Sequence, residues 1–211
     1  LICQKTMLAT DNLKRQIILC TSFIFLYTIG SNYLYSESNT ERLDPKNFVE
    51  TIYKKINKVA SKESNELERI SDMLSLFDDS ADVLFISRAV LGPSWKTSTK
   101  AERRHFSSAL KYYMAKKYGK QFGDFNSGNL RIENVKNQGS KGYLIDSKII
   151  TENSKSFDIS WQVVMHKTDL TLINIKFEGI SMIHTERTEI GNLLRSLSGS
   201  VPTLIKELEN Y

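Results

Sequence analysis

The sequence predicts an α+β fold in which a helical layer packs on a strongly twisted antiparallel sheet of about four strands and encloses an apolar cavity. Helical periodicity runs from residue 44 to about residue 122, and apolar and polar residues alternate over roughly the next 50 residues. The long amphipathic helix that begins near Thr99 needs a covering surface, and such a sheet offers one apolar face. With 211 residues, 40% hydrophobic and 25% charged, the chain can form one such core.

The first 36 residues have the composition of a secretory signal. Lys14 and Arg15 precede an apolar run at 17–30, and small or polar residues follow as far as Ser36. The run is shorter than the roughly 20 residues that span a bilayer, which favours cleavage over a permanent anchor. A buried N-terminal helix is the alternative, although no polar face interrupts the run. We therefore expect a cleaved signal at 1–36 and one domain at 37–211.

Cysteine and charge content narrow the functional classes. Both cysteines, Cys3 and Cys20, lie in the signal segment, so disulfides and thiolate metal sites are not expected in the mature domain. Lipidation of Cys20 is an alternative, but Leu19 stands where a small residue is expected. Because the segment removes three of 29 basic and one of 24 acidic residues, the domain stays mildly basic. A general nucleic-acid binder is therefore not expected.

The helical half begins at Asp44 and Pro45, which suit the N-cap and the first position of a helix. Apolar residues at helical spacing predict three helices, at about 45–60, 64–77 and 83–91. Thr99 and Glu102 then fit a capping box, in which the two side chains satisfy free backbone amides at a helix start. The fourth helix is the longest and fades near Phe122.

From Leu130 onward the apolar period changes to two, which predicts strands. In the last predicted strand Ile173, Ile175 and Phe177 alternate with outward polar residues such as Asn174. Short turn-like connections separate the strands, so neighbours are expected to pair antiparallel. Two further helices, at 185–197 and 202–208, are expected to close the chain.

The sequence offers little catalytic chemistry, and no enzymatic activity is expected. His105, His166 and His184 lack the spacing of zinc ligands. Neither a phosphate-cradling glycine loop nor a nucleophile elbow occurs. What remains is a large quantity of bulky apolar side chains, which suits a lipid-like ligand if a cavity lies between helix and sheet.

Charged clusters have simple structural interpretations. The acidic pairs Asp78–Asp79 and Glu186/Glu189 are interpreted as capping or helix-face charges, with an acid–base role as the alternative. The basic group comprises Lys116, Lys117 and Lys120. These cations suit the end of a helix, and attraction to an anionic membrane or an acidic partner is the alternative.

Two spaced motifs carry more information than periodicity does. The segment FDDSADVLFISRAVLGPSW is followed by TKAERRHFSSALKYYMAKKYG, and FEGISM follows at 177–182. Together they resemble the MlaC family, the soluble phospholipid-shuttle components of an intermembrane ABC transport system, also called toluene-tolerance auxiliary proteins. The matching positions of the first motif are Leu91, Gly92, Trp95, Phe106 and Tyr118.

After the second motif the family has Asn-Tyr-Arg, and Arg187 stands at the position of its arginine. The chain departs from the family pattern at three places. Pro93-Ser94 replaces Arg-Tyr, Leu170 replaces a common Trp, and Thr185-Glu186 replaces Asn-Tyr. These departures affect contacts at those positions and leave the apolar framework intact.

The resemblance implies a soluble periplasmic carrier of a Gram-negative bacterium that shields phospholipid acyl chains. Such a carrier passes lipid between an outer-membrane lipoprotein complex and an inner-membrane MCE-domain protein of an ABC transporter. We expect a monomer with no nucleic-acid partner and no cofactor beyond the bound phospholipid as cargo.

Acyl chains are expected between the helices and the sheet. The predicted lining residues from the helices are Val90, Trp95, Phe106, Leu110, Tyr113 and Met114. Those from the sheet are Tyr143, Ile145, Trp161, Val163, Ile173, Ile175 and Phe177. Packing in a solid core is the alternative for each of them. Arg187 or Lys176 either meets a phosphate or a partner, or is a solvated charge.

Two other functions stay open on the sequence alone. An enzyme on a cone-like α+β scaffold would need a polar cluster in the cavity, and the inward strand positions offer almost none. A secreted interaction module would instead have a solid core and no lipid ligand.

Overall fold

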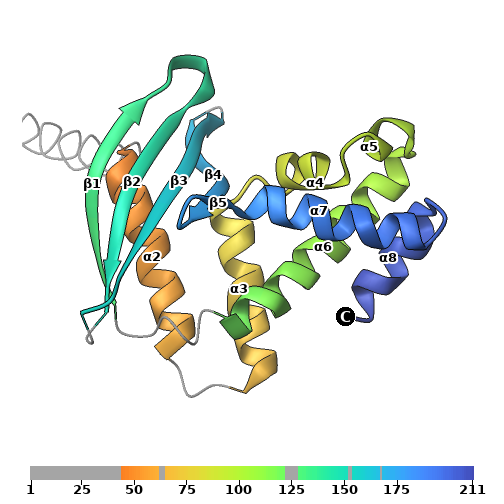
Figure 1. Cartoon of the computed structure of the whole chain (residues 1–211), viewed down its shortest axis with the longest axis horizontal. Coiled ribbons are helices and arrows are strands. Elements are labelled where there is room, and N and C mark those ends of the chain that lie inside the picture. Colours follow the sequence, from red (N-terminus) through yellow and green to blue (C-terminus); the bar gives the residue numbers. More distant parts are fainter. Residues whose placement is uncertain (1–43, 62–64, 122–127, 152–153, 167) are drawn as a thin grey trace, which may run out of the picture. The chain divides into compact units, whose positions relative to one another are not determined.

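The computed structural model describes residues 44–61, 65–121, 128–151, 154–166 and 168–211. Residues 43–211 form one compact unit that combines helices with a single antiparallel sheet, so the predicted α+β class is confirmed (Figure 1). The predicted signal at 1–36 and the predicted helix end at Phe122 lie outside the described residues. Within the described ranges, no helix is both long and apolar enough to cross a bilayer.

The helices follow the predicted pattern closely, apart from their ends. They are α2 (Pro45–Ser61), α3 (Glu66–Ser80), α4 (Val83–Leu91), α5 (Ser94–Thr97), α6 (Lys100–Gln121), α7 (Met182–Ser196) and α8 (Val201–Glu209). Helix α7 begins three residues before the predicted start, because the Ser181 side chain caps it by accepting a hydrogen bond from the His184 amide. The single turn α5 was not predicted.

The capping box at the start of α6 is present as predicted. The Thr99 amide donates to Glu102 Oε2 over 2.7 Å, and the Glu102 amide donates to Thr99 Oγ1 over 3.2 Å. These bonds lower the pKa of the Glu102 carboxyl, because they favour its charged form. Both partners lie within four residues of each other, so this motif could be recognised without knowing the fold.

The sheet has five strands in the order β1-β2-β3-β4-β5. They are β1 (Asn129–Asn137), β2 (Tyr143–Ile150), β3 (Ser156–His166), β4 (Asp169–Phe177) and β5 (Ile180–Ser181). The first four correspond to the predicted strands, and the two-residue β5 adds a short edge. All neighbours pair antiparallel, as the short connections predicted.

A bulge in β4 interrupts the alternation of apolar and polar residues that was predicted for this strand. Gln162 pairs with Asn174, whereas Val163 pairs with Leu172, so Ile173 is an extra residue in the ladder. Asn174, next to the bulge, pairs with Gln162 and is buried instead of facing solvent as expected. Its amide nitrogen donates to Gln162 Oε1 over 2.8 Å, and its oxygen accepts from the Ile183 amide over 3.2 Å. Asn174 therefore ties the sheet to the first turn of α7.

Helices meet the sheet at two places. Helix α2 contacts β1 and β2, while α3, α4 and α7 contact β4 (Figure 1). Helix α6, which the sequence suggested would lie across the sheet, has its main contacts with α3, α4 and α8. Its apolar side chains thus pack chiefly inside the helical half, because other helices, rather than the sheet, supply the covering surface.

The corner between α3 and α4 is attached directly to β4. The Asp82 amide donates to the Leu172 carbonyl over 3.0 Å, and Ala81 forms a parallel β-bridge with Leu172. Asp82 also caps α4, because its Oδ1 accepts from the Phe85 amide over 2.9 Å. One residue thus both starts a helix and holds it on the sheet.

Gly142, which precedes β2, provides a test of the sheet geometry. It has a φ of +82°, and a Cβ added there would overlap the Val163 carbonyl oxygen. We expect Gly142→Ala to lower the free energy of unfolding of residues 43–211 by about 2 kcal/mol or more. Urea unfolding followed by circular dichroism measures this loss.

Gly139 is the matched control, since it has a φ of +63° and a Cβ added there would meet no atom within 4 Å. Gly139→Ala should cost only the left-handed backbone penalty of about 1 kcal/mol. Equal losses for the two variants would contradict the close approach at Gly142.

Candidate functional site

A small apolar cavity of about 40 Å³ lies where the helices meet β4. It is lined by Phe77, Ala81, Ile86, Val90, Met114, Leu172, Ile173, Asn174, Ile175, Met182, Ile183 and Glu186. These residues come from α3, α4, α6, α7 and β4, and from the Ala81 connection. The volume is close to that of a single water molecule in the liquid, about 30 Å³. The side chains therefore nearly close the space between helices and sheet.

Four predicted lining residues meet at this cavity. Val90 and Met114 reach it from α4 and α6, and Ile173 and Ile175 reach it from β4. Ile173 does so at the bulge, where the strict alternation of β4 is interrupted. The structure thus brings together residues that are separated by as many as 85 positions in the chain.

The other predicted sheet residues share one face of the sheet. The register pairs Tyr143 with Val163 and Ile145 with Trp161, and it pairs Phe177 with Ile159. Residues that pair across antiparallel strands point to the same side. Ile145, Trp161 and Val163 are fully or almost fully buried, whereas Tyr143 and Phe177 are partly exposed.

Trp161 has a complete set of polar contacts within this face. Its Nε1 donates to Ser147 Oγ over 2.9 Å, and Ser147 Oγ donates to the Ile159 carbonyl over 3.2 Å. Ser147 is itself buried. The indole nitrogen therefore already has a hydrogen-bond partner within the sheet.

The remaining predicted lining residues lie in the helical half. Phe106, Leu110 and Tyr113 are buried on α6, and none of them is among the described residues that line the 40 Å³ cavity. Trp95 lies on α5 and lines a separate hollow at the surface. The structure therefore divides the predicted lining set between a cavity wall, a sheet face, a helical core and a surface hollow.

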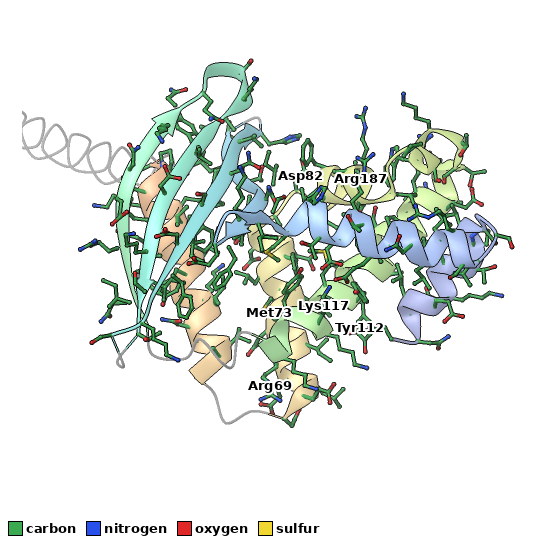
Figure 2. All side chains as sticks on the ribbon, in the orientation of Figure 1. Arg69, Met73, Asp82, Tyr112, Lys117 and Arg187 are labelled. Carbon is green, nitrogen blue, oxygen red and sulfur yellow. The ribbon has the colours of Figure 1, made fainter. Side chains whose placement is uncertain are left out.

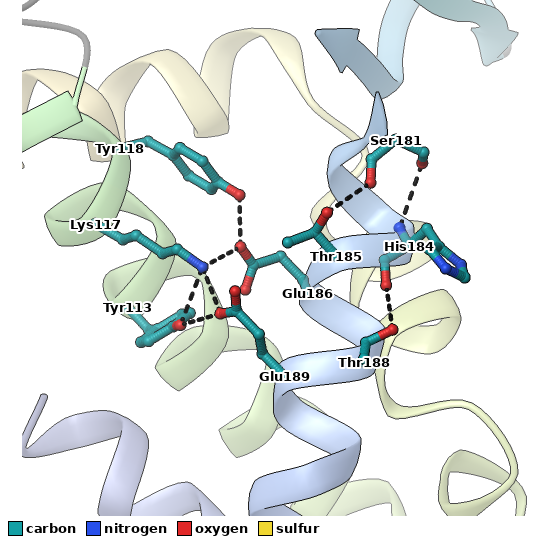
Figure 3. Close-up of polar contacts among 9 residues, drawn as sticks. All are labelled: Tyr113, Lys117, Tyr118, Ser181, His184, Thr185, Glu186, Thr188 and Glu189. Atoms are coloured by element: carbon teal, nitrogen blue, oxygen red, sulfur yellow. Dashed lines mark hydrogen bonds and ion pairs between the residues drawn. The ribbon is translucent and has the colours of Figure 1, made fainter. Parts of the chain in front are cut away.

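A buried ion pair beside the cavity was missed from the sequence. Glu186 is 0% exposed, so its interpretation as a helix-face or capping charge is wrong. Lys117 Nζ lies 2.8 Å from Glu186 Oε1 and 2.5 Å from Glu189 Oε2, and Tyr118 donates to Glu186 Oε1 over 2.5 Å (Figure 3). The cluster joins α6 to α7.

Lys117 lies near the end of α6, as the helix-end interpretation expected, but its ammonium group is paired with two carboxylates of α7. Burial opposes its charge, but hydrogen bonds to Glu186 and Glu189 outweigh that effect and raise the pKa of its ammonium group. Burial, together with the nearby charge of Glu186, also raises the pKa of Tyr113 to about 12. The same causes raise the pKa of Tyr118. At neutral pH the cluster therefore holds charged Lys117 and neutral tyrosines.

The second oxygen of Glu186, Oε2, is buried and has no hydrogen-bond partner in the described structure. Glu186 also lines the apolar cavity. The only sequence signal for this arrangement was that Thr185-Glu186 departs from the family's Asn-Tyr. By contrast, Asp78 and Asp79 pair with Lys111 and Lys55 at the surface, as expected of helix-face charges.

Removing Lys117 tests the buried pair. Lys117→Met leaves the Glu186 carboxylate without its cation, and loss of one partner of a buried pair costs about 3–5 kcal/mol of unfolding free energy. Urea denaturation should show that loss in Lys117→Met. The double variant Lys117→Met/Glu186→Leu should recover most of it, because no isolated charge remains buried. A loss below about 1 kcal/mol in Lys117→Met would mean that Glu186 is not held as described.

Comparisons with known proteins agree with this fold. A family model described as MlaC protein matches residues 46–210. A solved structure, the phospholipid-binding protein from Ralstonia solanacearum in complex with a phospholipid, superposes with a TM-score of 0.66 at 13% sequence identity. The match covers 79% of this chain and 96% of that chain, and at this identity it shows the fold. The resemblance carried by the two sequence motifs is therefore confirmed, and this chain belongs to the MlaC family.

Proposed function

We propose that this protein binds phospholipid and carries it as cargo, rather than catalysing a reaction. The observation that carries the proposal is the apolar cavity between β4 and the helices, in a chain of the MlaC family. The structurally similar protein from Ralstonia solanacearum, which was solved with a phospholipid, supports the same ligand class. Burial of acyl chains needs apolar area and no catalytic groups, and the cavity wall is apolar apart from Asn174 and Glu186.

Lipid binding requires the cavity to open. A volume of about 40 Å³ is far below the roughly 300–1,000 Å³ of ligand pockets. Each CH₂ group kept from water is worth about 0.8 kcal/mol, so two acyl chains represent roughly 20 kcal/mol. That free energy can offset the cost of separating side chains that pack against one another in the closed form. The described structure is, on this proposal, the closed form, because its cavity is too small for acyl chains.

Opening is proposed to occur along β4. Of the described helices, α3, α4 and α7 meet the sheet at this strand, and the cavity lies at their junction. Val90, Met114, Ile173 and Ile175 would be the first predicted lining residues to contact an acyl chain. Widening along the sheet face would add Tyr143, Ile145, Trp161, Val163 and Phe177, and widening into the helical half would add Trp95, Phe106, Leu110 and Tyr113.

The finer role proposed is that of a monomeric periplasmic shuttle in a Gram-negative bacterium. It would receive or deliver phospholipid at an outer-membrane lipoprotein complex and at an inner-membrane MCE-domain protein of an ABC transporter. Family membership supports this role. A signal segment cleaved after about residue 36 would deliver residues 37–211 to the periplasm.

A second candidate is an interaction module with a solid core. The small volume of the cavity favours this second candidate, because side chains already fill most of the space between the helices and the sheet. The two candidates differ in whether lipid accompanies the purified protein.

Lipid content is the direct test. Residues 43–211, purified from bacteria without detergent, should release phospholipid on solvent extraction, and native mass spectrometry should show protein–lipid complexes. Protein that carries no lipid and takes none from donor vesicles would support the solid-core module instead. Ile175→Asp places a charge at the cavity and should reduce lipid per protein about ten-fold or more. Ile180→Asp, at a residue 64% exposed, is the matched control and should bind as wild type.

A reversible cross-link tests the place of opening. Ala81 and Leu172 form a β-bridge, which brings their Cα atoms within the range of a disulfide. Because the only cysteines of the chain are Cys3 and Cys20, Ala81→Cys/Leu172→Cys in residues 43–211 would contain a single pair. Oxidation should slow uptake of fluorescent phospholipid from vesicles about ten-fold, and dithiothreitol should restore it. Uptake that is unaffected by oxidation would place the opening elsewhere.

A further inference from the structure

A second hollow, of about 400 Å³, lies at the surface between α4, α5 and α7. It is lined by Phe85, Arg88, Ala89, Gly92, Pro93, Trp95, Lys96 and Arg187. Among these lining residues none is acidic, and three carry a positive charge. The rest of the wall is mainly apolar. The hollow therefore offers several cations around an apolar floor.

The apolar part of this surface extends along α4. Leu84 and Phe85 are 60% and 45% exposed and are adjacent in the chain, so they form a small exposed apolar patch. On a helix, residues three and four apart are neighbours, so Arg88 lies next to both of them. We call Leu84, Phe85, Arg88, Lys96 and Arg187 the α4–α7 outer surface. It combines exposed hydrophobic residues with cations on one side of the molecule.

Arg187 is held in place within this surface. Arg187 lies on α7 beside α4 (Figure 2). Its Nη1 donates to the Ala89 carbonyl over 3.2 Å, and its guanidinium lies over Gly92, where an added Cβ would be 3.1 Å away. Gly92 has a φ of +63°, so a glycine suits both the backbone and the close guanidinium. A guanidinium anchored by one nitrogen keeps its other donors for an anion.

Trp95 and Lys96 are also fixed. Arg103 Nε donates to the Trp95 carbonyl over 2.8 Å and Nη2 donates to the Lys96 carbonyl over 3.1 Å. The Arg103 guanidinium lies 5.6 Å from the Trp95 ring centre. The nearby acidic residues Asp82 and Glu102 already accept backbone hydrogen bonds in helix caps. Among the described residues, none of Arg88, Lys96 and Arg187 forms a salt bridge with a carboxylate.

This surface lies opposite the apolar cavity on the same pair of helices. Ile86 and Val90 of α4 and Glu186 of α7 line the cavity, whereas Phe85 of α4 and Arg187 of α7 line the outer hollow. A contact that moves α4 and α7 therefore acts directly on the cavity wall. Cations next to exposed apolar side chains are the pattern by which proteins bind anionic lipid surfaces.

We propose that the α4–α7 outer surface docks on membranes that contain anionic phospholipid. Arg88, Lys96 and Arg187 contact headgroup phosphates, and Leu84 and Phe85 enter the interface between headgroups and acyl chains. The occupant is a bilayer surface rather than an acidic protein segment, because two large apolar side chains project beside the cations. This inference concerns a surface separate from the proposed cargo site.

Vesicle co-sedimentation of residues 43–211 tests the inference. The unit contains the buried core of the described structure, so it is the suitable species. It should partition onto phosphatidylcholine vesicles that contain phosphatidylglycerol, and much less onto phosphatidylcholine alone. Binding should weaken as salt is raised, since exposed charges are screened. Arg88→Gln/Arg187→Gln should reduce partitioning about ten-fold or more, and Leu84→Ser/Phe85→Ser should also reduce it.

Lys54→Gln/Lys155→Gln removes the same charge from exposed residues of α2 and the β2–β3 connection, and should bind as wild type. Thermal unfolding of every variant checks that the fold is kept. Equal binding by the two double charge variants would overturn the inference. So would binding to polyglutamate but not to anionic vesicles, which would indicate an acidic protein partner. Vesicle binding by protein that carries no lipid would leave this inference standing and refute the proposed function alone.

Discussion

The attachment of the helices to strand β4 is the constraint on which the rest of the structure depends. Helices α3, α4 and α7 all contact this strand, and backbone and side-chain hydrogen bonds fix their positions there. Asp82 bonds to Leu172, and Asn174 bonds to the start of α7. Because these polar groups are paired with each other, they anchor the helices while the surrounding side chains remain apolar. An apolar cavity bounded by five elements is the direct consequence.

The cavity and the ion pair beside it both favour the closed arrangement of the helices. The apolar wall gains from being closed, since every separated side chain exposes area to water. The pair of Lys117 and Glu186 joins α6 to α7 and loses much of its value if the helices separate and water enters. Movement of α6 and α7 as one body would keep the pair intact. Separation of the helices from β4 would therefore open the cavity at a lower cost than separation of α6 from α7.

The outer side of α4 and α7 adds a second kind of chemistry to this framework. Neighbouring residues of α7 lie on opposite sides of the helix: Glu186 lines the cavity, and Arg187 lines the outer hollow. A lipid carrier must both shield acyl chains and approach the places where lipids are exchanged. On the two proposals above, a single helix pair with an apolar inner side and a cationic outer side would serve both needs, because side chains one residue apart on a helix point in different directions.

Short-range patterns in the sequence predicted much of the fold, since the interactions that carry them span few residues. The capping box of Thr99 and Glu102, the N-cap at Asp44 and the helical and strand periodicities could all be recognised locally. Two motifs also sufficed to indicate the family. Long-range contacts were decided only by the tertiary structure. Lys117 and Glu186, for example, are 69 residues apart. The apolar face of a predicted helix likewise does not indicate whether a sheet or another helix covers it. The sequence therefore determined the class of fold and which apolar residues could be buried, and the packing decided which of them meet at β4 and which charge is buried beside them.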